Sequence, residues 1–370
     1  MAFDLLIHAG RLVCPKNGRD GPGSVAVRGD RIVAVGPDVN GAATQVLDCP
    51  EAVLLPGLID LHTHPAKTGS VFGGDPDRYL LSRGTTTAMS QGDAGAQNLR
   101  QFVEETVEAS RTRVIAAINL SSVGESATAG CFTNLERANV DACVQALEAN
   151  RKHIWGIAVN VSRNACGDTD PRAVLRRGLE AAERSGLPIL YGMRRFEDWP
   201  AADQLRLLRP GDVVTYCFRR EPHCIVEEGR VLPAVRDARQ RGILFDVGHG
   251  TASFDFDVAE AALGDGFPPD TISTDWQAKH AGCKPAHDLP RVMAKLLAAG
   301  MNEADVFAAA TWKSAEILRN DEIGSLTVNA CADLTVLGCN DDELLHDVNG
   351  NRRRARCWYP RLTVRAGAIV

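Results

Sequence analysis

The sequence lacks the features that mark membrane, secreted and nucleic-acid-binding proteins. No run of apolar residues approaches the roughly 18 that a transmembrane helix needs, so no membrane-spanning helix is expected. The N-terminal segment, MAFDLLIHAGRLV, has no basic stretch followed by a long apolar core, and it is therefore not expected to be a signal peptide. With 41 basic and 47 acidic residues the net charge is −6, which predicts no broad basic face for nucleic acid or an anionic membrane.

Paired cysteine motifs and phosphate-binding loops are also missing. The eleven cysteines include no CxxC pair, and their odd number in 370 residues indicates reduced thiols and a cytoplasmic protein. The glycine-rich segments at 73–75 and 92–95 match neither a phosphate loop nor a dinucleotide-binding fingerprint. We interpret both segments as turns between elements.

Apolar strand candidates alternate with helical segments through the middle of the chain. The predicted strands are 53–61, 85–89, 114–119, 156–161, 188–191, 213–218, 243–247 and 271–273. The predicted helices are 98–109, 171–185, 231–240 and 289–299. Such alternation is typical of a parallel sheet covered by helices, and eight units predict an α/β fold of the (β/α)8 barrel type.

Both ends of the chain are predicted to be β-rich. Residues 1–52 alternate between short apolar strands and turns, and the segments 332–337 and 361–370 are also strand-like. We therefore predict a small β-sandwich domain formed by residues 1–52 and 325–370, beside a barrel formed by residues 53–324. The polar segment 340–354 is predicted to be a loop.

The most informative motif is His62-Thr63-His64, which follows the apolar run VLLPGLIDL. Residues two apart in a strand point to the same side, so both imidazoles are expected to project together from the strand's C-terminal end. A parallel barrel keeps its catalytic residues at that end. Paired imidazoles suit zinc, manganese or iron, whereas the alternative is a chance pair of surface histidines. The apolar strand and the Pro-Gly break before the motif favour a metal site.

The order of these features resembles the amidohydrolase superfamily over nearly the whole chain. The resemblance is carried by PGLIDLHTH at 56–64, ISTDW at 272–276 and GSLTVNACADLTVL at 324–337. Two further segments, RGTTTAMSQGDAGAQN and ILFDVGHGTASFDF, are similar to dihydroorotase-like and N-acyl amino acid deacylase-like members. The resemblance implies six metal ligands: two His on strand one, a carboxylated Lys on strand four, one His each on strands five and six, and an Asp on strand eight.

Three of the six implied ligands are absent from this sequence. His62, His64 and Asp275 match the implied set. The lysine position holds Ala158, the strand-five position holds Gly192 (or Tyr191 if the alignment shifts by one), and the strand-six position holds Tyr216.

Because the bridging lysine is missing, we predict one divalent ion in place of two. Zinc is the first candidate, with manganese and iron as alternatives, and three protein ligands suffice for a catalytic zinc. The fourth ligand could be Cys217, His223, His249 or Tyr216, and the sequence does not choose among them.

Two residues are candidates for catalysis. Asp275 follows an apolar strand, where a carboxylate can bind metal and accept a proton, or can simply cap the next helix. Tyr216 can donate a hydrogen bond to a developing oxyanion, or can fill the space left by the missing histidine.

Three further residues are candidates for substrate binding. His249 lies between two glycines that allow a ligand to approach closely, and its alternatives are a metal ligand or a core histidine. Arg194 and Arg219 follow the strands that have lost a histidine. A guanidinium there can replace missing metal charge or grip an anionic substrate, and the alternative is a solvated loop.

These observations predict a metal-dependent hydrolase of a C–N bond in a small amide or cyclic amide that carries a carboxylate. The alternative is a barrel that has lost metal chemistry, either a ligand-binding protein or a decarboxylase or isomerase that uses Arg and Tyr. A mononuclear deaminase fits less well, because such sites also need the missing strand-five histidine. A homo-oligomer is implied by the resemblance alone, and no nucleic-acid or membrane partner is predicted.

Overall fold

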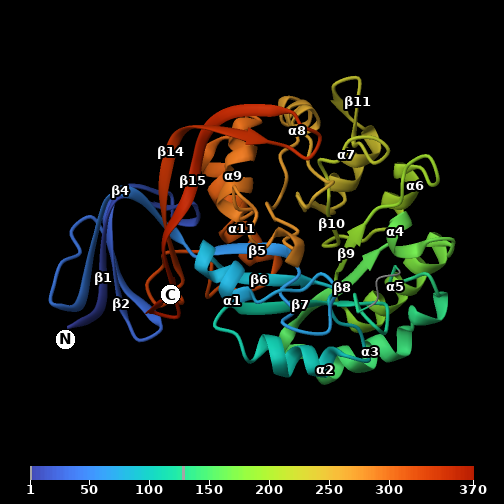
Figure 1. The fold of residues 1–370 in the computed structure, drawn as a ribbon, viewed down its shortest axis with the longest axis horizontal. Coiled ribbons are helices and arrows are strands. Elements are labelled where there is room, and N and C mark those ends of the chain that lie inside the picture. Colours follow the sequence, from blue (N-terminus) through green and yellow to red (C-terminus); the bar gives the residue numbers. More distant parts are fainter. Residues whose placement is uncertain (1, 127–129) are drawn as a thin grey trace.

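Seven parallel strands form the central sheet of the structure, a computed structural model that describes residues 2–126 and 130–370 (Figure 1). Neighbouring strands follow the order β13-β10-β9-β8-β7-β6-β5, and every pair is parallel. Their bounds are β5 Leu58–Thr63, β6 Thr85–Gln91, β7 Arg113–Asn119, β8 Ile154–Asn160, β9 Ile189–Gly192, β10 Val213–Val214 and β13 Leu244–Phe245. Burial on both faces explains why most of these strands are rich in apolar residues, although β6 (TTTAMSQ) is largely polar.

The segment 271–276 lies between the two edge strands of this sheet. Thr271 makes a parallel bridge to Asp246, next to β13, and Trp276 makes a parallel bridge to Thr63 of β5. The seven strands and this segment therefore form a continuous ring, and the predicted eighth strand at 271–273 occupies the closing position.

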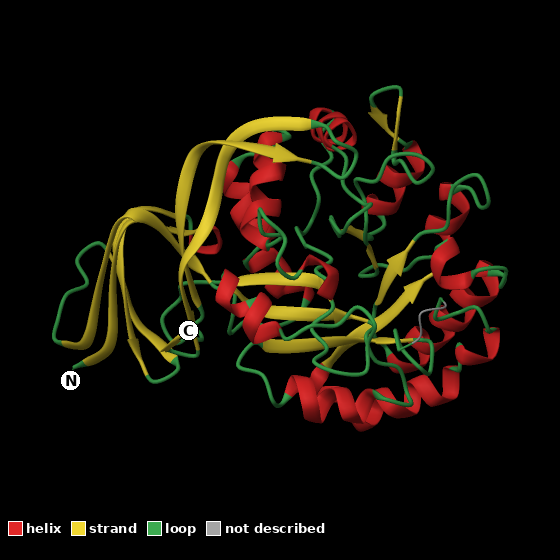
Figure 2. Cartoon of the chain, viewed as in Figure 1, coloured by secondary structure: helices red, strands yellow, loops and turns green. Residues whose placement is uncertain are grey.

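Helices surround the ring on the outside (Figure 2). Their bounds are α1 Pro76–Tyr79, α2 Leu99–Phe102, α3 Val140–Ala149, α4 Arg163–Cys166, α5 Pro171–Ser185, α6 Ala201–Arg206, α7 Pro233–Gln240, α8 Phe256–Gly264, α9 Leu289–Ala298, α10 Glu303–Ala309 and α11 Trp312–Ile317. Three predicted helices correspond to α5, α7 and α9. The prediction at 98–109 corresponds to α2 and a wider turn over Val103–Val107.

The ends of α5 illustrate why the sequence folds this way locally. Asp170 accepts a hydrogen bond from the backbone N–H of Arg172, and Pro171 occupies the first turn, where its missing N–H is not needed. Gly186 ends the helix with a φ of 67°, a left-handed conformation that glycine adopts without strain.

Strands from both ends of the chain form a second sheet, with the order β16-β15-β14-β4-β1-β2-β3. Their bounds are β1 Phe3–Cys14, β2 Arg19–Arg28, β3 Arg31–Gly36, β4 Ala43–Pro56, β14 Leu334–His346, β15 Arg352–Arg365 and β16 Ala368–Ile369. The two ends join where β4 pairs antiparallel with β14. A short hairpin, β11 Val226–Glu227 and β12 Arg230–Val231, stands apart from both sheets. The sandwich form and the division of the chain at residues 52 and 325 stay predictions.

The predicted strand at 53–61 is in fact two strands. β4 ends at Pro56 in the terminal sheet, and β5 begins at Leu58 in the barrel. Gly57 joins them where the chain passes close to Thr86, because an added Cβ at Gly57 would lie 2.2 Å from the Thr86 hydroxyl. The apolar run therefore spans both sheets and does not belong to the barrel alone.

The predicted loop at 340–354 is wrong. β14 and β15 extend through most of this segment and pair as a long antiparallel hairpin. Charged side chains of this hairpin form ion pairs with neighbouring elements. Glu343 of β14, for example, lies 2.8 Å from Arg291 of α9. The polar composition therefore reflects ion pairs with the barrel helices and not an irregular backbone.

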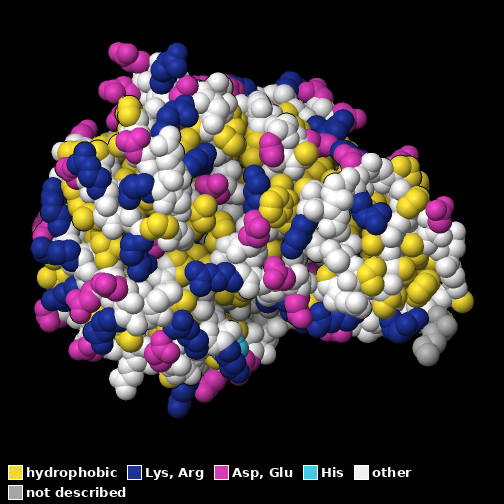
Figure 3. All heavy atoms as spheres, turned by 180° about the vertical axis from the view of Figure 1, so that it is seen from behind, with side chains coloured by type: hydrophobic (Ala, Val, Ile, Leu, Met, Phe, Trp, Pro, Cys, Tyr) yellow, Lys and Arg dark blue, Asp and Glu magenta, His cyan; other side chains and the backbone are white. Residues whose placement is uncertain are grey.

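The surface carries both signs of charge. On the face shown in Figure 3, basic and acidic side chains are interspersed over both parts of the molecule. Within residues 2–126 and 130–370, no helix is long and apolar enough to span a bilayer.

Candidate metal centre and cavity

His62 lies at the end of β5 and is oriented through its Nδ1 atom. Nδ1 lies 2.8 Å from Oγ1 of Thr215, and that hydroxyl donates to Asp246 Oδ2 at 2.9 Å. Because the single Thr215 proton is used on Asp246, the Thr215 oxygen accepts the N–H of His62 Nδ1. The Nε2 atom of His62 therefore carries its lone pair, as a metal ligand must.

His64 is oriented by a carboxylate. Its Nδ1 lies 3.0 Å from Asp93 Oδ1, and Ser90 Oγ donates to Asp93 Oδ2 at 2.6 Å. Burial lowers the pKa of His64, but the carboxylates of Asp93 and Asp275 outweigh it and raise that pKa to about 10. Nε2 of His64 therefore binds a proton strongly, and a metal ion must compete with that proton for the nitrogen.

Asp275 completes the group from the closing segment 271–276. Its Oδ1 lies 3.5 Å from Nε2 of His62 and 3.5 Å from Nε2 of His64. Burial raises the pKa of Asp275, but the two imidazoles and a hydrogen bond from Gln277 lower it to about 2. The carboxylate is therefore ionised at neutral pH, which suits a divalent cation.

These three residues satisfy the geometry expected of a metal site. Their ligand atoms all lie within 4.8 Å of one another, and all three side chains are buried. In the part of the chain that the structure describes, no other group of three His, Cys, Asp or Glu residues comes so close together. The predicted metal residues are thus brought together, and the donor set fits zinc, manganese or iron.

The two glycines beside His249 make room for this site. An added Cβ at Gly250 would lie 2.4 Å from Asp275 Oδ2, and one at Gly248 would lie 2.9 Å from the Tyr216 ring. The sequence predicts that a ligand approaches His249 in this space. In the structure, the space is filled by the side chains of Asp275 and Tyr216.

Tyr216 and Arg219 lie beside the metal group. The Tyr216 hydroxyl is 3.3 Å from Nε2 of His62. The Arg219 guanidinium stacks over the Tyr216 ring, 4.0 Å from its centroid, and its Nε donates to Ser253 Oγ at 2.7 Å. Burial lowers the pKa of Arg219, because no carboxylate pairs with it directly among the described residues.

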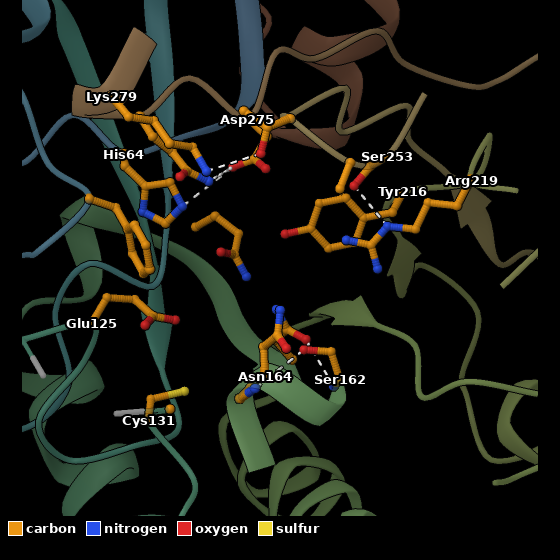
Figure 4. Close-up of a pocket in the computed structure, with 18 residues that line it drawn as sticks. His64, Glu125, Cys131, Ser162, Asn164, Tyr216, Arg219, Ser253, Asp275 and Lys279 are labelled. Carbon is orange, nitrogen blue, oxygen red and sulfur yellow. Dashed lines mark hydrogen bonds and ion pairs between the residues drawn. The ribbon is translucent and has the colours of Figure 1, made fainter. Parts of the chain in front are cut away.

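A cavity of about 410 Å³ opens in front of these groups. Figure 4 shows His64 and Asp275 on one side, Tyr216 and Arg219 on another, Glu125 opposite them, and Ser162 and Asn164 along the floor. Four predicted site residues line the cavity: His64, Tyr216, Arg219 and Asp275. His62 lies behind them, fully buried.

The cavity is also lined by polar residues that the sequence did not predict. Gln91 ends β6, Asn160 ends β8, and Glu125 follows β7. Burial raises the pKa of Glu125 to about 7, although His64 opposes the shift. The available signal was the polar residue that ends an otherwise buried strand, as in β6 and β8; Glu125, six residues beyond the end of β7, gave no such signal.

Arg194 and His249 do not line the cavity. The Arg194 Nε donates to Asp198 at 2.8 Å. The His249 ring stacks on Phe254, with Nδ1 2.8 Å from the carbonyl of Gly250 and Nε2 2.7 Å from Nζ of Lys295. His249 therefore has the contacts of a satisfied core histidine, one of the alternatives considered for it.

The positions of the missing ligands are occupied in different ways. Ala158 is 2% exposed and packs among apolar residues of the barrel interior. Gly192 lies against Asn160, since an added Cβ would be 2.8 Å from the Asn160 side chain. Of these three positions, Tyr216 alone presents a polar atom to the metal group.

The ring of parallel strands, with a buried metal-binding triad and a cavity at one end, defines a barrel enzyme. No family model matches the chain. A solved adenine deaminase superposes on it with a TM-score of 0.89 at 27% identity, covering 100% of this chain and 99% of that one. A solved dihydroorotase gives a TM-score of 0.87 at 30% identity, covering 99% and 98%.

A curated relative narrows the class further. A deacetylase of Agrobacterium fabrum is 34% identical over 349 residues, which cover 92% of this chain and 84% of that protein. The chain belongs to the amidohydrolase superfamily. The named relatives are hydrolases that act on C–N bonds, so the predicted superfamily and the predicted class of enzyme are confirmed.

Proposed function

We propose that this enzyme hydrolyses an amide or cyclic amide with one divalent ion, zinc first, held by His62, His64 and Asp275. The observation that carries the proposal is the orientation of the imidazoles. Thr215 and Asp93 engage the two Nδ1 atoms, so both Nε2 atoms face Asp275 Oδ1. A second ion is not proposed, because Ala158, Gly192 and Tyr216 stand where the resemblance implies its ligands.

A divalent ion held by this triad would lower the pKa of a bound water molecule and would polarise the substrate carbonyl. The chain's own residues handle the proton. Asp275 Oδ1 faces the histidines, whereas Oδ2 faces Gly250 and accepts the proton of the attacking water. The same oxygen then passes that proton to the leaving nitrogen.

Tyr216 and Arg219 bind the substrate. The Tyr216 hydroxyl points into the cavity beside the triad and donates to the oxygen of the carbonyl that is attacked (Figure 4). Arg219 donates a hydrogen bond from Nε to Ser253 Oγ. Its two terminal nitrogens can then bind a substrate carboxylate. Arg219 is half-buried and forms no ion pair with a carboxylate of the described residues, which supports an anionic substrate, since a partly desolvated cation gains from a partner.

Metal content of the purified protein tests this proposal. Elemental analysis is expected to find close to one zinc, manganese or iron per chain, and none in the His62→Ala/His64→Ala variant. A matched control, His8→Ala/His153→Ala, removes two histidines away from the cavity and is expected to retain the metal.

Two results would contradict the proposal. Two ions per chain would mean that ligands for a second ion have been overlooked. No ion, even after growth with added zinc or manganese, would favour a barrel that uses Arg219 and Tyr216 without metal. One ion per chain justifies a screen of N-acyl amino acids and cyclic amides, with and without a carboxylate.

A further inference from the structure

The Tyr216 hydroxyl and the metal-binding triad form one compact group of four atoms. Oη of Tyr216 lies 3.3 Å from His62 Nε2. Asp275 Oδ1 lies 3.5 Å from the same nitrogen and 3.5 Å from His64 Nε2. The phenol thus stands beside His62 at nearly the distance at which Asp275 stands.

These separations match those between ligands of a tetrahedral ion. With bonds of about 2.0–2.1 Å, a tetrahedral zinc separates its ligand atoms by about 3.3–3.4 Å. A tetrahedron of four ligand atoms has six edges. Three of these edges, Tyr216–His62, Asp275–His62 and Asp275–His64, already have nearly this length.

His249 does not meet this condition, because its ring nitrogens contact the Gly250 carbonyl and Lys295. Among the described residues, neither Cys217 nor His223 joins the triad in the group whose ligand atoms lie within 4.8 Å of one another.

The backbone at Tyr216 supports a role that goes beyond filling space. Its φ is 68°, a left-handed conformation that is unfavourable for a bulky side chain. Asp275 has a similar φ of 48°. Strain of this kind persists where the surrounding structure imposes it and is common at functional sites. Gly248 provides the space that the ring requires, since an added Cβ there would collide with it.

Burial and the Asp275 carboxylate raise the pKa of the Tyr216 phenol well above its usual range, and Arg219 opposes this shift. Arg219 stacks over the ring at 4.0 Å, where a cation is attracted to the electron-rich face and offsets a negative charge on the phenol oxygen. Ser253 holds Arg219 in this orientation through its Nε (Figure 4).

We propose that Oη of Tyr216 is the fourth ligand of the ion in the resting enzyme and that a substrate carbonyl displaces it. This inference rests on the proposed function, because it uses the same ion. On binding, the phenol O–H proton passes to solvent. On displacement, the phenolate takes a proton back from solvent, and the restored hydroxyl donates to the carbonyl oxygen.

Copper binding to the metal-free protein tests the resting state. Cu²⁺ alone, added to one equivalent, is expected to give a visible phenolate-to-copper charge-transfer band. The band should vanish in Tyr216→Phe while about one equivalent of copper still binds. The assignment is simple because the chain has four tyrosines, and Tyr191→Phe, which removes a buried hydroxyl bonded to Gln204, is a control that should keep the band.

A second variant guards against loss of folding. Tyr216→His supplies a different ligand at the same position, so it is expected to bind one copper with no phenolate band. A band that survives in Tyr216→Phe or in Tyr216→His would overturn the assignment to Tyr216.

The failures of the two proposals can be told apart. Copper that binds wild type, is lost in His62→Ala/His64→Ala and gives no phenolate band would overturn the tyrosine ligand alone. Failure of copper to bind wild type at all would overturn both proposals. Saturating acetohydroxamate, which carries a carbonyl oxygen, is expected to bleach the band, and a band that does not change would overturn the displacement.

Discussion

His62 and His64 share a strand, but different groups orient them. His62 donates to a hydroxyl that is itself held by the carboxylate of Asp246, whereas His64 donates directly to the carboxylate of Asp93. A carboxylate partner raises the basicity of an imidazole ligand more than a hydroxyl does. His64 is therefore the stronger metal ligand of the two in this enzyme.

The substitution Asp93→Asn tests this difference. The amide keeps the shape of the side chain but removes its charge, so metal affinity is expected to fall by about 10- to 100-fold. Competition with a chromogenic chelator measures the affinity. Asp342→Asn, which changes an exposed carboxylate on the terminal hairpin, serves as the control. Equal affinities in all three proteins would show that Asp93 does not tune the site.

The sequence predicts the metal ligands better than the groups that orient them. His62 and His64 are predicted from strand periodicity, and Asp275 is predicted from its place after an apolar strand. Asp93 acts on a histidine 29 residues away, and Thr215 on one 153 residues away. Such contacts depend on the order of strands around the ring, and short-range patterns carry no information about that order.

At the scale of elements, α9 shows a similar limit. Its position at 289–298 could be predicted from its apolar periodicity, but the inward orientation of Lys295 could not. Lys295 is 7% exposed, and its Nζ lies 2.7 Å from Nε2 of His249. Burial, aided by Arg291 and opposed by Asp347, lowers the pKa of Lys295 to about 7.

This buried lysine predicts a pH-dependent stability. Between pH 7 and 10.5 the unfolded chain binds a proton at Lys295 that the folded chain does not. The free energy of unfolding of the wild type is therefore expected to rise with pH in this window, by up to about 1.4 kcal/mol per pH unit, relative to Lys295→Met. Below pH 7 the difference between the two proteins should be constant.

Urea unfolding from pH 6 to 9.5 measures the effect. Because the cysteines titrate in both proteins, their contribution cancels in the difference. Lys152→Met, at an exposed lysine, is the control and is expected to track the wild type. A difference between wild type and Lys295→Met that does not vary with pH would mean that the folded protein keeps Lys295 charged.

The long hairpin β14–β15 explains the clearest error of secondary-structure prediction. Residues 340–354 are rich in Asp, Asn and Arg, a composition typical of exposed loops. In the structure, Arg353 binds Glu260 of α8 while the backbone stays paired. A strand whose side chains meet charged helices has no apolar face, so its periodicity is not visible in the sequence.

At the scale of the whole molecule, one carboxylate links the terminal sheet to the barrel. Asp333, just before β14, is 3% exposed and binds two arginines from different sheets. Arg113 of β7 reaches its Oδ2 at 3.1 Å, and Arg365 of β15 reaches its Oδ1 at 3.2 Å. The backbone N–H of Ala366 also donates to Oδ1, at 2.8 Å. This one side chain therefore pairs with an arginine of each sheet.

Removing that carboxylate is expected to destabilise the whole chain. Asp333→Ala leaves two largely buried guanidinium groups without a counter-charge, which typically costs about 3–5 kcal/mol of unfolding free energy. Asp341→Ala breaks an exposed pair with Arg356 and should cost at most about 1 kcal/mol. Urea unfolding compares the two.

Because Asp333 holds both sheets, its loss should also lower the cooperativity of unfolding, since each sheet can then open without breaking the pair that joins it to the other. If the two variants cost the same and unfold in one equally sharp transition, the sheets are joined by their apolar contacts and the ion pairs add nothing.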